Sequence, residues 1–300
     1  MRFDVGWPKL VAVVTADQIA WIDTAMASLG RSRPGPIEVF RAEPWATVSS
    51  TLDGEGRRVW FKANESCFEH EAALLSILAA AVPDAVLEPI AVEPETGWFL
   101  TDDGGPLATE DDGLAIAETY VRVVVASAEL VDEMLAAGVP DRRPAALPAL
   151  FDAACAHPEA GDAGERCVQE RDRFVRACEL LAADGRSALA DSDIGPHHAF
   201  AGPPLRLYDW SDGSVTHPLV PVFNLGRQLD PGPAAARLLT DAWGDSVDGR
   251  TAAAASLVAR LLGADVWMRV PPEAWVRHPG GIERWVGRLA DGLAQAVDFA

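Results

Sequence analysis

Residues 191–212 read DSDIGPHHAFAGPPLRLYDWSD. The segment is rich in Asp, Gly, Pro and His, and its short period predicts a hairpin around residues 202–204. Asp193 and Asp209 lie sixteen residues apart, in predicted loops bordered by apolar residues. Acidic side chains in apolar surroundings usually bind something, so this pair is the first candidate for a functional site. A plain turn at Asp193 and a strand-end cap at Asp209 are the alternative.

The chain on either side of this segment has two different characters, which meet near residues 102–107. A capping box over Thr15–Gln18 predicts a helix through about Leu29. Strands are expected at 37–40, 45–52, 59–62, 86–92 and 97–101, with a helix over 67–81 after the third strand. Helical patterns dominate afterwards, at 114–137, 147–156, 165–183 and after 226. This order predicts an α+β chain with a sheet-rich N-lobe over 1–106 and a helical C-lobe over 107–300.

Length and charge limit the possible functions. A chain of 300 residues exceeds the commonest single-core size, and 49% apolar residues can build a sizeable core. The formal charge of −20 disfavours nucleic acid and anionic membrane surfaces as partners. The same charge would attract a cationic small substrate, although an acidic surface also simply keeps a protein soluble.

The four cysteines, Cys67, Cys155, Cys167 and Cys178, form no CxxC pair and no metal-ligand spacing. They fit a reducing compartment with unpaired thiols. The chain reaches Asp17 before any long apolar run, which argues against a signal peptide. No stretch approaches the ~18 uninterrupted apolar residues that span a bilayer, so we expect a cytoplasmic protein.

A lysine and a glutamate of the N-terminal part could act together with the two aspartates. Lys62 ends a predicted strand, and Glu71 lies nine residues later inside the predicted helix, where it could hold the ammonium through an ion pair. Phosphoryl transfer needs a cation on the nucleotide phosphates, carboxylates that hold a metal, and a carboxylate near the attacking hydroxyl. Taken alone, an ordinary surface lysine and helix glutamate would give the same pattern.

Several motifs, in this order, resemble the aminoglycoside phosphotransferase and choline kinase family. VWFKA at 59–63, FEHEAALL at 68–75 and GWFLTDDGG at 97–105 look like its N-lobe, and AAGVPDRR at 136–143 looks like a connector between C-lobe helices. DIGPHH at 193–198 is similar to its catalytic loop, usually His-Gly-Asp-Leu-His-Pro-Gly-Asn. YDWSD at 208–212 and HP at 217–218 resemble the metal-binding segment that follows. The likeness runs from about residue 37 to beyond 218, with a looser helical match afterwards.

The resemblance implies a protein-kinase-like fold, with a small antiparallel-sheet N-lobe and a larger helical C-lobe. It also implies roles for four side chains. Lys62 would contact the phosphates of ATP and Glu71 would orient it. Asp193 would accept or orient the proton of a substrate hydroxyl, and Asp209 would bind magnesium.

The expected hinge adds two positions to the nucleotide site. Trp98 precedes this hinge, so the backbone from Phe99 through Thr101 to Asp102 is placed to face an adenine ring. Phe99 and Thr101 are therefore expected to bind the cofactor. The ten tryptophans, including Trp45, Trp98 and Trp210, are expected mostly in the core.

Three departures from the family pattern concern the metal and the nucleotide. His198 stands where the family has its metal-binding asparagine, and imidazole suits manganese or zinc better than magnesium. Asp191 replaces the loop histidine and adds a second carboxylate near Asp193, which would raise the pKa of one of the two. The turn over the nucleotide, at 41–47, contains no glycine and has less freedom to approach phosphates.

The leading hypothesis is an ATP-dependent phosphotransferase that acts on a hydroxyl of a small molecule, with Asp209 and His198 holding magnesium or manganese. The main alternative is a catalytically impaired, kinase-like binding or regulatory protein. A zinc site of His197, His198 and Asp209 and a helical scaffold without a nucleotide site are further alternatives. The substrate and the oligomeric state stay open, because specificity in such a fold depends on the surfaces of the helical lobe.

Overall fold

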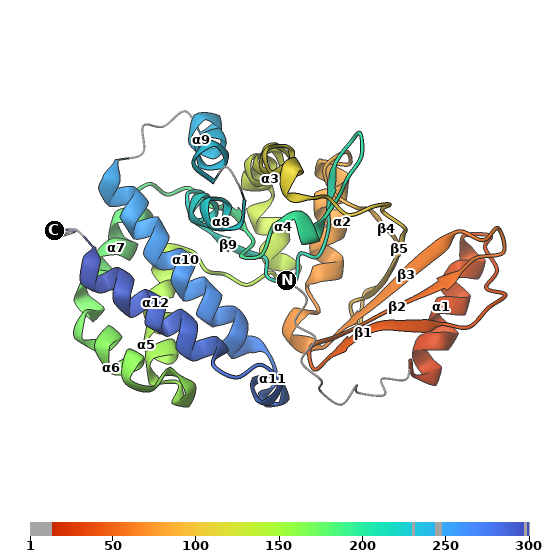
Figure 1. Ribbon diagram of the computed structural model, residues 1–300, viewed down its shortest axis with the longest axis horizontal. Coiled ribbons are helices and arrows are strands. Elements are labelled where there is room, and N and C mark those ends of the chain that lie inside the picture. The colour runs from red at the N-terminus through yellow and green to blue at the C-terminus, as the bar shows by residue number, and fades with distance from the viewer. Residues whose placement is uncertain (1–13, 230–231, 244–247, 297–298, 300) are drawn as a thin grey trace.

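The chain forms two lobes that lie side by side along its longest axis (Figure 1). The structure is a computed structural model that describes residues 14–229, 232–243, 248–296 and 299. The smaller lobe contains a five-stranded sheet, and the larger lobe is mostly helical. The predicted α+β, protein-kinase-like arrangement of a small antiparallel N-lobe and a helical C-lobe is confirmed.

The N-lobe sheet is antiparallel throughout, with strand order β1-β2-β3-β5-β4. Each predicted strand is present, with bounds shifted by a few residues. Asp53 shapes the turn between the second and third strands, because its Oδ1 accepts hydrogen bonds from the backbone N–H groups of Glu55 and Arg57, both at 2.9 Å. The strands are β1 (Glu38–Glu43), β2 (Ala46–Leu52), β3 (Arg58–Asn64), β4 (Pro89–Glu93) and β5 (Trp98–Asp102).

One face of the sheet is covered by α1 (Ala16–Ser28). The predicted capping box begins this helix: Thr15 Oγ1 accepts from the N–H of Gln18, and Gln18 Oε1 accepts from the N–H of Thr15. Ile22 and Met26 are buried against an apolar cluster that includes Phe61 of β3. The helix thus fixes the strand that carries Lys62.

The helix α2 (Glu71–Ala81) lies between the sheet and the C-lobe (Figure 1). We predicted one helix from residue 67, but residues 66–68 form a 3-10 turn and α2 begins only at Glu71. Asn64 holds this turn by donating from Nδ2 to the carbonyl of Phe68 at 3.1 Å. Leu74 and Leu78 of α2 are fully buried in the core shared with the C-lobe.

The C-lobe is built around the long helix α10, which packs against α5, α7, α8 and α12. Two predicted helices are interrupted: residues 128–130 form a 3-10 turn inside 114–137, and Glu170 leaves helical geometry inside 165–183. The helices are α3 (Gly113–Ser127), α4 (Val131–Ala136), α5 (Leu147–Ala156), α6 (Gly161–Gln169), α7 (Arg171–Ala182), α8 (Val220–Gln228), α9 (Gly232–Ala242), α10 (Gly249–Arg269), α11 (Pro272–Arg277) and α12 (Gly281–Gln295).

Among the described residues, α10 alone is long and apolar enough to cross a membrane. More than half of its apolar stretch, 56%, is buried inside the protein. Leu257, Val258 and Leu261 contribute to this buried surface within the core of the C-lobe. The helix therefore has the surroundings of a core helix.

Two short ribbons carry the loops of the 191–212 segment. β6 (Ala188–Ala190) pairs with β9 (Ser214–Thr216), and β7 (Ala199–Phe200) pairs with β8 (Arg206–Leu207). The second ribbon is the hairpin predicted around residues 202–204. Both ribbons are antiparallel, so the loop after β6 and the loop after β8 are held close to one another at the lobe interface.

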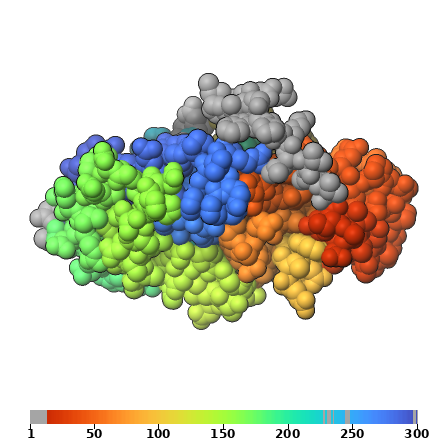
Figure 2. Space-filling model, turned by 90° about the horizontal axis from the view of Figure 1, so that it is seen from below, coloured from red at the N-terminus to blue at the C-terminus, as the bar shows by residue number. Residues whose placement is uncertain are grey.

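The turn between β1 and β2 touches the C-lobe. Arg277 Nη1 donates to Glu43 Oε2 at 3.3 Å, and the ring of Trp45 lies 6.3 Å from that of Trp267 and 5.3 Å from that of His278. Figure 2 shows the blue C-terminal region directly against the orange N-lobe. The side chains of this glycine-free turn therefore form contacts between the two lobes.

Candidate active site between the lobes

The ammonium of Lys62 joins the two lobes. Its Nζ lies 2.7 Å from a carboxylate oxygen of Glu71 in α2 and 2.7 Å from Oδ1 of Asp209, which follows β8. Asn64 Nδ2 donates to Glu71 at 2.7 Å, and the backbone N–H of Trp210 donates to the same carboxylate at 3.1 Å. Side chains of β3 and α2 are thus held in one hydrogen-bonded group with the distant segment at 209–210.

Two carboxylates share this one ammonium. Burial alone would lower the pKa of Lys62, but the charges of Asp209 and Glu71 outweigh burial and raise it. Burial alone would raise the pKa of Asp209, but the charges of Lys62 and His198 hold it well below its usual value. Burial raises the pKa of Glu71, and the nearby charge of Asp209 adds to that rise. Two carboxylates therefore depend on a single ammonium at this site.

The backbone at Asp209 has an unusual conformation. Its φ is +61°, and Asp209 is the only non-glycine residue with a positive φ among the described residues. Aspartate tolerates this left-handed region better than most residues, and such strain often marks functional sites. Ser211 Oγ donates to Asp209 Oδ1 at 3.1 Å and helps to fix the carboxylate.

Hydrogen bonds from and to Asp191 hold the loop that carries Asp193. The N–H of Asp193 donates to Asp191 Oδ1 at 2.8 Å, and the N–H of Asp191 donates to the hydroxyl of Tyr120 at 2.8 Å. Asn224 Nδ2 donates to the carbonyl of Asp191 at 3.1 Å. Asp191 is thus a buried support for the loop and does not line either cavity described below.

Asp191 has the raised pKa in this carboxylate pair, but the charge of Asp193 is only a minor cause. Burial is the larger cause of the raised pKa of Asp191, followed by the charge of Asp212. Burial also acts to raise the pKa of Asp193, but the hydrogen bond from His197 and the charge of His198 outweigh it, so that pKa is lowered. Asp193 therefore has a lower pKa than an ordinary aspartate in spite of its burial.

His198 lies between the two aspartates of the 191–212 segment. Its Nδ1 lies 2.8 Å from the backbone carbonyl of Asp193, and its Nε2 lies 3.4 Å from Asp209 Oδ2. His197 extends to the outer side of the loop, with Nε2 at 3.5 Å from Asp193 Oδ2. One ligand atom each from Asp193, His197 and His198 lie within 4.8 Å of one another.

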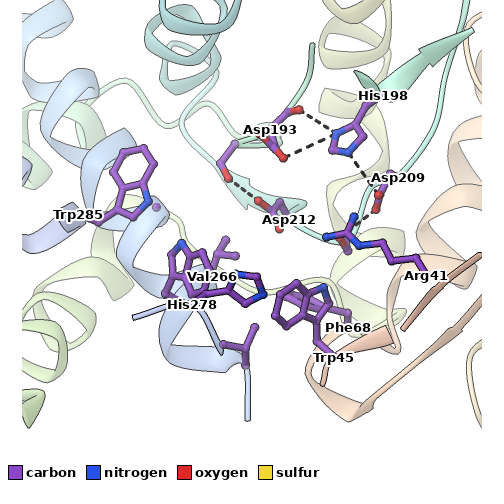
Figure 3. A pocket seen from close by; sticks show the side chains of 15 residues that line it. Arg41, Trp45, Phe68, Asp193, His198, Asp209, Asp212, Val266, His278 and Trp285 are labelled. Carbon is purple, nitrogen blue, oxygen red and sulfur yellow. Dashed lines mark hydrogen bonds and ion pairs between the residues drawn. The ribbon is translucent and has the colours of Figure 1, made fainter. Parts of the chain in front are cut away.

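A cavity of about 360 Å³, here called the acidic cavity, opens beside these residues. Carboxylates lie along one side of it and aromatic rings along the other, as Figure 3 shows. Ser192 Oγ donates to Asp212 at 2.6 Å on the acidic side. The carboxylates are Asp193, Asp209 and Asp212, and the rings are Trp45, Phe68, Trp267, His278 and Trp285.

A second cavity of about 310 Å³, here called the apolar cavity, lies on the sheet side. The predicted cofactor-binding residues Lys62, Glu71, Phe99 and Thr101 all line it. The other lining residues include Phe40, Trp60, Leu75, Phe200 and Tyr208. Among the described residues, Asp209 alone lines both cavities.

Several solved structures share the two-lobed fold of this chain. No protein-family model and no curated protein sequence matches the chain. Macrolide 2'-phosphotransferase type I matches with a TM-score of 0.55 at 18% identity, over 95% of this chain and 100% of that chain. Choline kinase LicA from Streptococcus pneumoniae matches with a TM-score of 0.64 at 13% identity, over 93% and 99%. This is the aminoglycoside phosphotransferase and choline kinase fold.

A structure of this phosphotransferase fold with both ligands bound is also similar to the chain. Spectinomycin phosphotransferase in complex with ADP and spectinomycin matches with a TM-score of 0.55 at 11% identity, over 92% of this chain and 98% of that chain. The resemblance inferred from motif order is thereby confirmed for the fold.

Sequence patterns did not identify the aromatic side of the acidic cavity. Within the phosphotransferase fold, Trp267 comes from α10 and Trp285 from α12, where a tryptophan in an apolar helical pattern predicts core.

Asp212 lies inside the YDWSD motif, but the motif alone predicted no function for it. Its pKa is raised to about 6, mainly by burial, although the hydrogen bond from Ser192 opposes the rise.

Proposed function

We propose that the chain is an ATP-dependent phosphotransferase that transfers a phosphoryl group to a hydroxyl of a small molecule. The observation that supports this most is the position of Asp209, which is shared by two cavities of different chemistry. One cavity is mostly apolar and is lined by Lys62, which pairs with Asp209, and the other is lined by carboxylates. Phosphoryl transfer brings a nucleotide and an acceptor hydroxyl together beside a metal ion that protein side chains hold.

The apolar cavity suits a nucleotide. Phe99 and Thr101 of β5 line it, and a flat purine there would contact apolar side chains and backbone groups. Lys62, the cross-strand partner of Phe99, lines the same cavity and would bind the phosphates. Glu71 would keep the ammonium in place while phosphate oxygens compete for it with Asp209.

The residues at the border of the cavities fit a divalent metal ion. Asp209 Oδ2 and His198 Nε2 lie 3.4 Å apart, and beside them two carboxylates share one ammonium. Magnesium or manganese bound here would neutralise charge on the nucleotide phosphates. Asp209 would supply the oxygen ligand and His198 the nitrogen ligand.

The acidic cavity suits the acceptor. Asp193 lines it and is 47% exposed, so an incoming hydroxyl can reach its carboxylate. During transfer, the bond from the γ-phosphorus to the ADP oxygen breaks, a bond to the acceptor oxygen forms, and the hydroxyl proton passes to Asp193. Because phosphoryl transfer needs little covalent help, Asp193 mainly orients the hydroxyl.

The surroundings of Asp193 favour an acceptor that has an apolar face and a positive charge. Such a molecule could lie on Trp45 and Trp267 while its charge faces Asp212. The net charge of −20 supports small molecules over nucleic acid or membrane surfaces as partners. The free cysteines are in keeping with a cytoplasmic location.

The direct test is a transfer screen with γ-labelled ATP against a library of hydroxyl-bearing small molecules, run with magnesium and with manganese. The expected result is label transfer to at least one amine-bearing alcohol, lost in Asp193→Asn. A parallel melting experiment separates this function from the kinase-like binding protein. If ATP with either metal raises the melting temperature but no acceptor is labelled, the binding protein is favoured. If neither metal with ATP shifts the melting temperature, the proposed nucleotide site is wrong.

A further inference from the structure

The hydrogen bond at Nδ1 fixes the tautomer of His198. A backbone carbonyl can only accept, so the 2.8 Å contact with the carbonyl of Asp193 requires a proton on Nδ1 of His198. Nε2 is then the ring nitrogen that is left to bind a metal ion. The side chain is 13% exposed, so packing also holds the ring in this orientation.

The second ring nitrogen of His198 faces the carboxylate of Asp209. Figure 3 shows this nitrogen directed toward Asp209, whose Oδ2 is 3.4 Å from Nε2. Imidazole nitrogen and carboxylate oxygen are both metal ligands, and a divalent ion between these two atoms would be bound by both. Two ligands at adjacent corners of an octahedron with bonds of about 2.1 Å lie about 3 Å apart. The observed separation is therefore close to what one shared metal ion needs.

We propose that His198 Nε2 and Asp209 Oδ2 select a divalent first-row transition ion such as Mn²⁺ over Mg²⁺ as the partner of the bound nucleotide. This inference rests on the proposed nucleotide site. Magnesium requires near-ideal octahedral oxygen ligation, whereas imidazole nitrogen is a good ligand for transition ions. His198 is thus a residue that determines metal specificity.

A metal on Asp193, His197 and His198 would be a different site. His198 can offer it only Nε2, because Nδ1 is occupied by the carbonyl of Asp193, and Nε2 is the atom directed at Asp209. His197 is 52% exposed and lies on the outer side of the loop. It is therefore the matched control: an adjacent imidazole that the proposed site does not use.

The test measures the metal environment directly. The protein would be loaded with Mn²⁺ and β,γ-methylene ATP, once with natural histidine and once with ¹⁵N-labelled histidine, and pulsed electron paramagnetic resonance would detect nitrogen bound to manganese. Calorimetric titration would compare the affinity for the analogue in Mn²⁺ and in Mg²⁺. Both measurements would be repeated for His198→Asn and His197→Gln.

The wild-type protein is expected to show a nitrogen signal that changes on ¹⁵N labelling, and to bind the analogue at least about tenfold more tightly with Mn²⁺ than with Mg²⁺. His198→Asn should lose the signal and most of this preference, while His197→Gln should keep both. The labelled wild-type protein tests the inference even if His198→Asn does not fold.

Three outcomes would overturn the inference. A manganese signal that is insensitive to histidine labelling, with equal affinities in both metals, would overturn it alone. Loss of the signal in His197→Gln but not in His198→Asn would place the metal on the other cluster. Absence of analogue binding with either metal would instead overturn the proposed function on which the inference rests.

Discussion

The ammonium of Lys62 donates to Oδ1 of Asp209 at 2.7 Å, across a separation of 147 residues in the chain. Oδ2 of the same carboxylate faces His198, so each oxygen has a separate partner. Asp209 therefore connects a cation of the N-lobe with an imidazole of the C-lobe. A metal ion can bind at Oδ2 without removing Lys62 from Oδ1.

Loss of Lys62 should destabilise the protein strongly. Lys62→Met leaves the buried Glu71 and the partly exposed Asp209 without their shared cation, and removal of one member of a buried pair costs about 3–5 kcal/mol. The additional change Glu71→Gln should restore part of that loss, because it removes one uncompensated charge. Denaturant unfolding measures both. Arg171→Met, which breaks an exposed pair with Asp152, should cost less than about 1 kcal/mol. A double variant no more stable than Lys62→Met would argue against charge as the cause.

Removal of the Asp193 carboxylate should stop transfer and spare nucleotide binding. Asp193 lines the acidic cavity and not the apolar one, so Asp193→Asn leaves the proposed nucleotide contacts unchanged. We expect turnover to fall by about 10²–10⁴-fold, with the affinity for ATP within about twofold of the wild type. Steady-state kinetics and calorimetry provide the two numbers. Unchanged turnover in this variant would show that Asp193 does not act on the hydroxyl.

The carboxyl of Asp212 should make stability depend on pH. Its folded-state pKa is about 6, above the ordinary value of 3.8, so its ionisation costs stability as pH rises through this window, and the full cost is present above about pH 6. Asp212→Asn should therefore stabilise the protein by about 2–3 kcal/mol near pH 8 and by little near pH 4. Denaturant unfolding at both pH values tests this. As a control, the exposed change Glu55→Gln should alter stability by less than about 0.5 kcal/mol at either pH. An equal gain in stability of Asp212→Asn at both pH values would show that ionisation of Asp212 is not the cause.

Two helical glycines should respond oppositely to alanine. A Cβ at Gly263 in α10 would lie 2.4 Å from the ring of Trp285, whereas a Cβ at Gly287 in α12 would have no neighbour within 4 Å. Gly263→Ala should destabilise the protein by about 1–3 kcal/mol and displace Trp285 within the acidic cavity. Gly287→Ala should stabilise it by up to about 1 kcal/mol through helix propensity. Thermal unfolding with tryptophan fluorescence follows both effects, and a stabilising Gly263→Ala would contradict the packing described.

Features with local causes were predictable from the sequence. The capping box at Thr15 and Gln18 and the hairpin around residues 202–204 depend on residues only a few positions apart. The predicted start of α2 is several residues too early. Phe68 is buried against Val270 and Ala274 of the C-lobe, and this contact keeps its turn out of the helix. That tertiary contact leaves no local pattern.

The candidate site likewise has one part that the sequence predicts and one part that it does not. The order of motifs placed Lys62, Glu71 and Asp209 in one expected group, and the structure brings their charged atoms together. The aromatic side of the acidic cavity could not be predicted, because Trp267 and Trp285 meet only when α10 and α12 pack. A periodic helical pattern contains the same tryptophans whether they line a cavity or fill a core.

The most direct test of the convergence at Asp209 is calorimetric titration with ATP, with and without a divalent metal, for the wild type and Asp209→Asn. The wild type is expected to bind ATP more tightly when Mn²⁺ or Mg²⁺ is present, and Asp209→Asn should lose that dependence on metal. Metal-dependent binding that is equal in both proteins, or no binding by the wild type, would contradict the account.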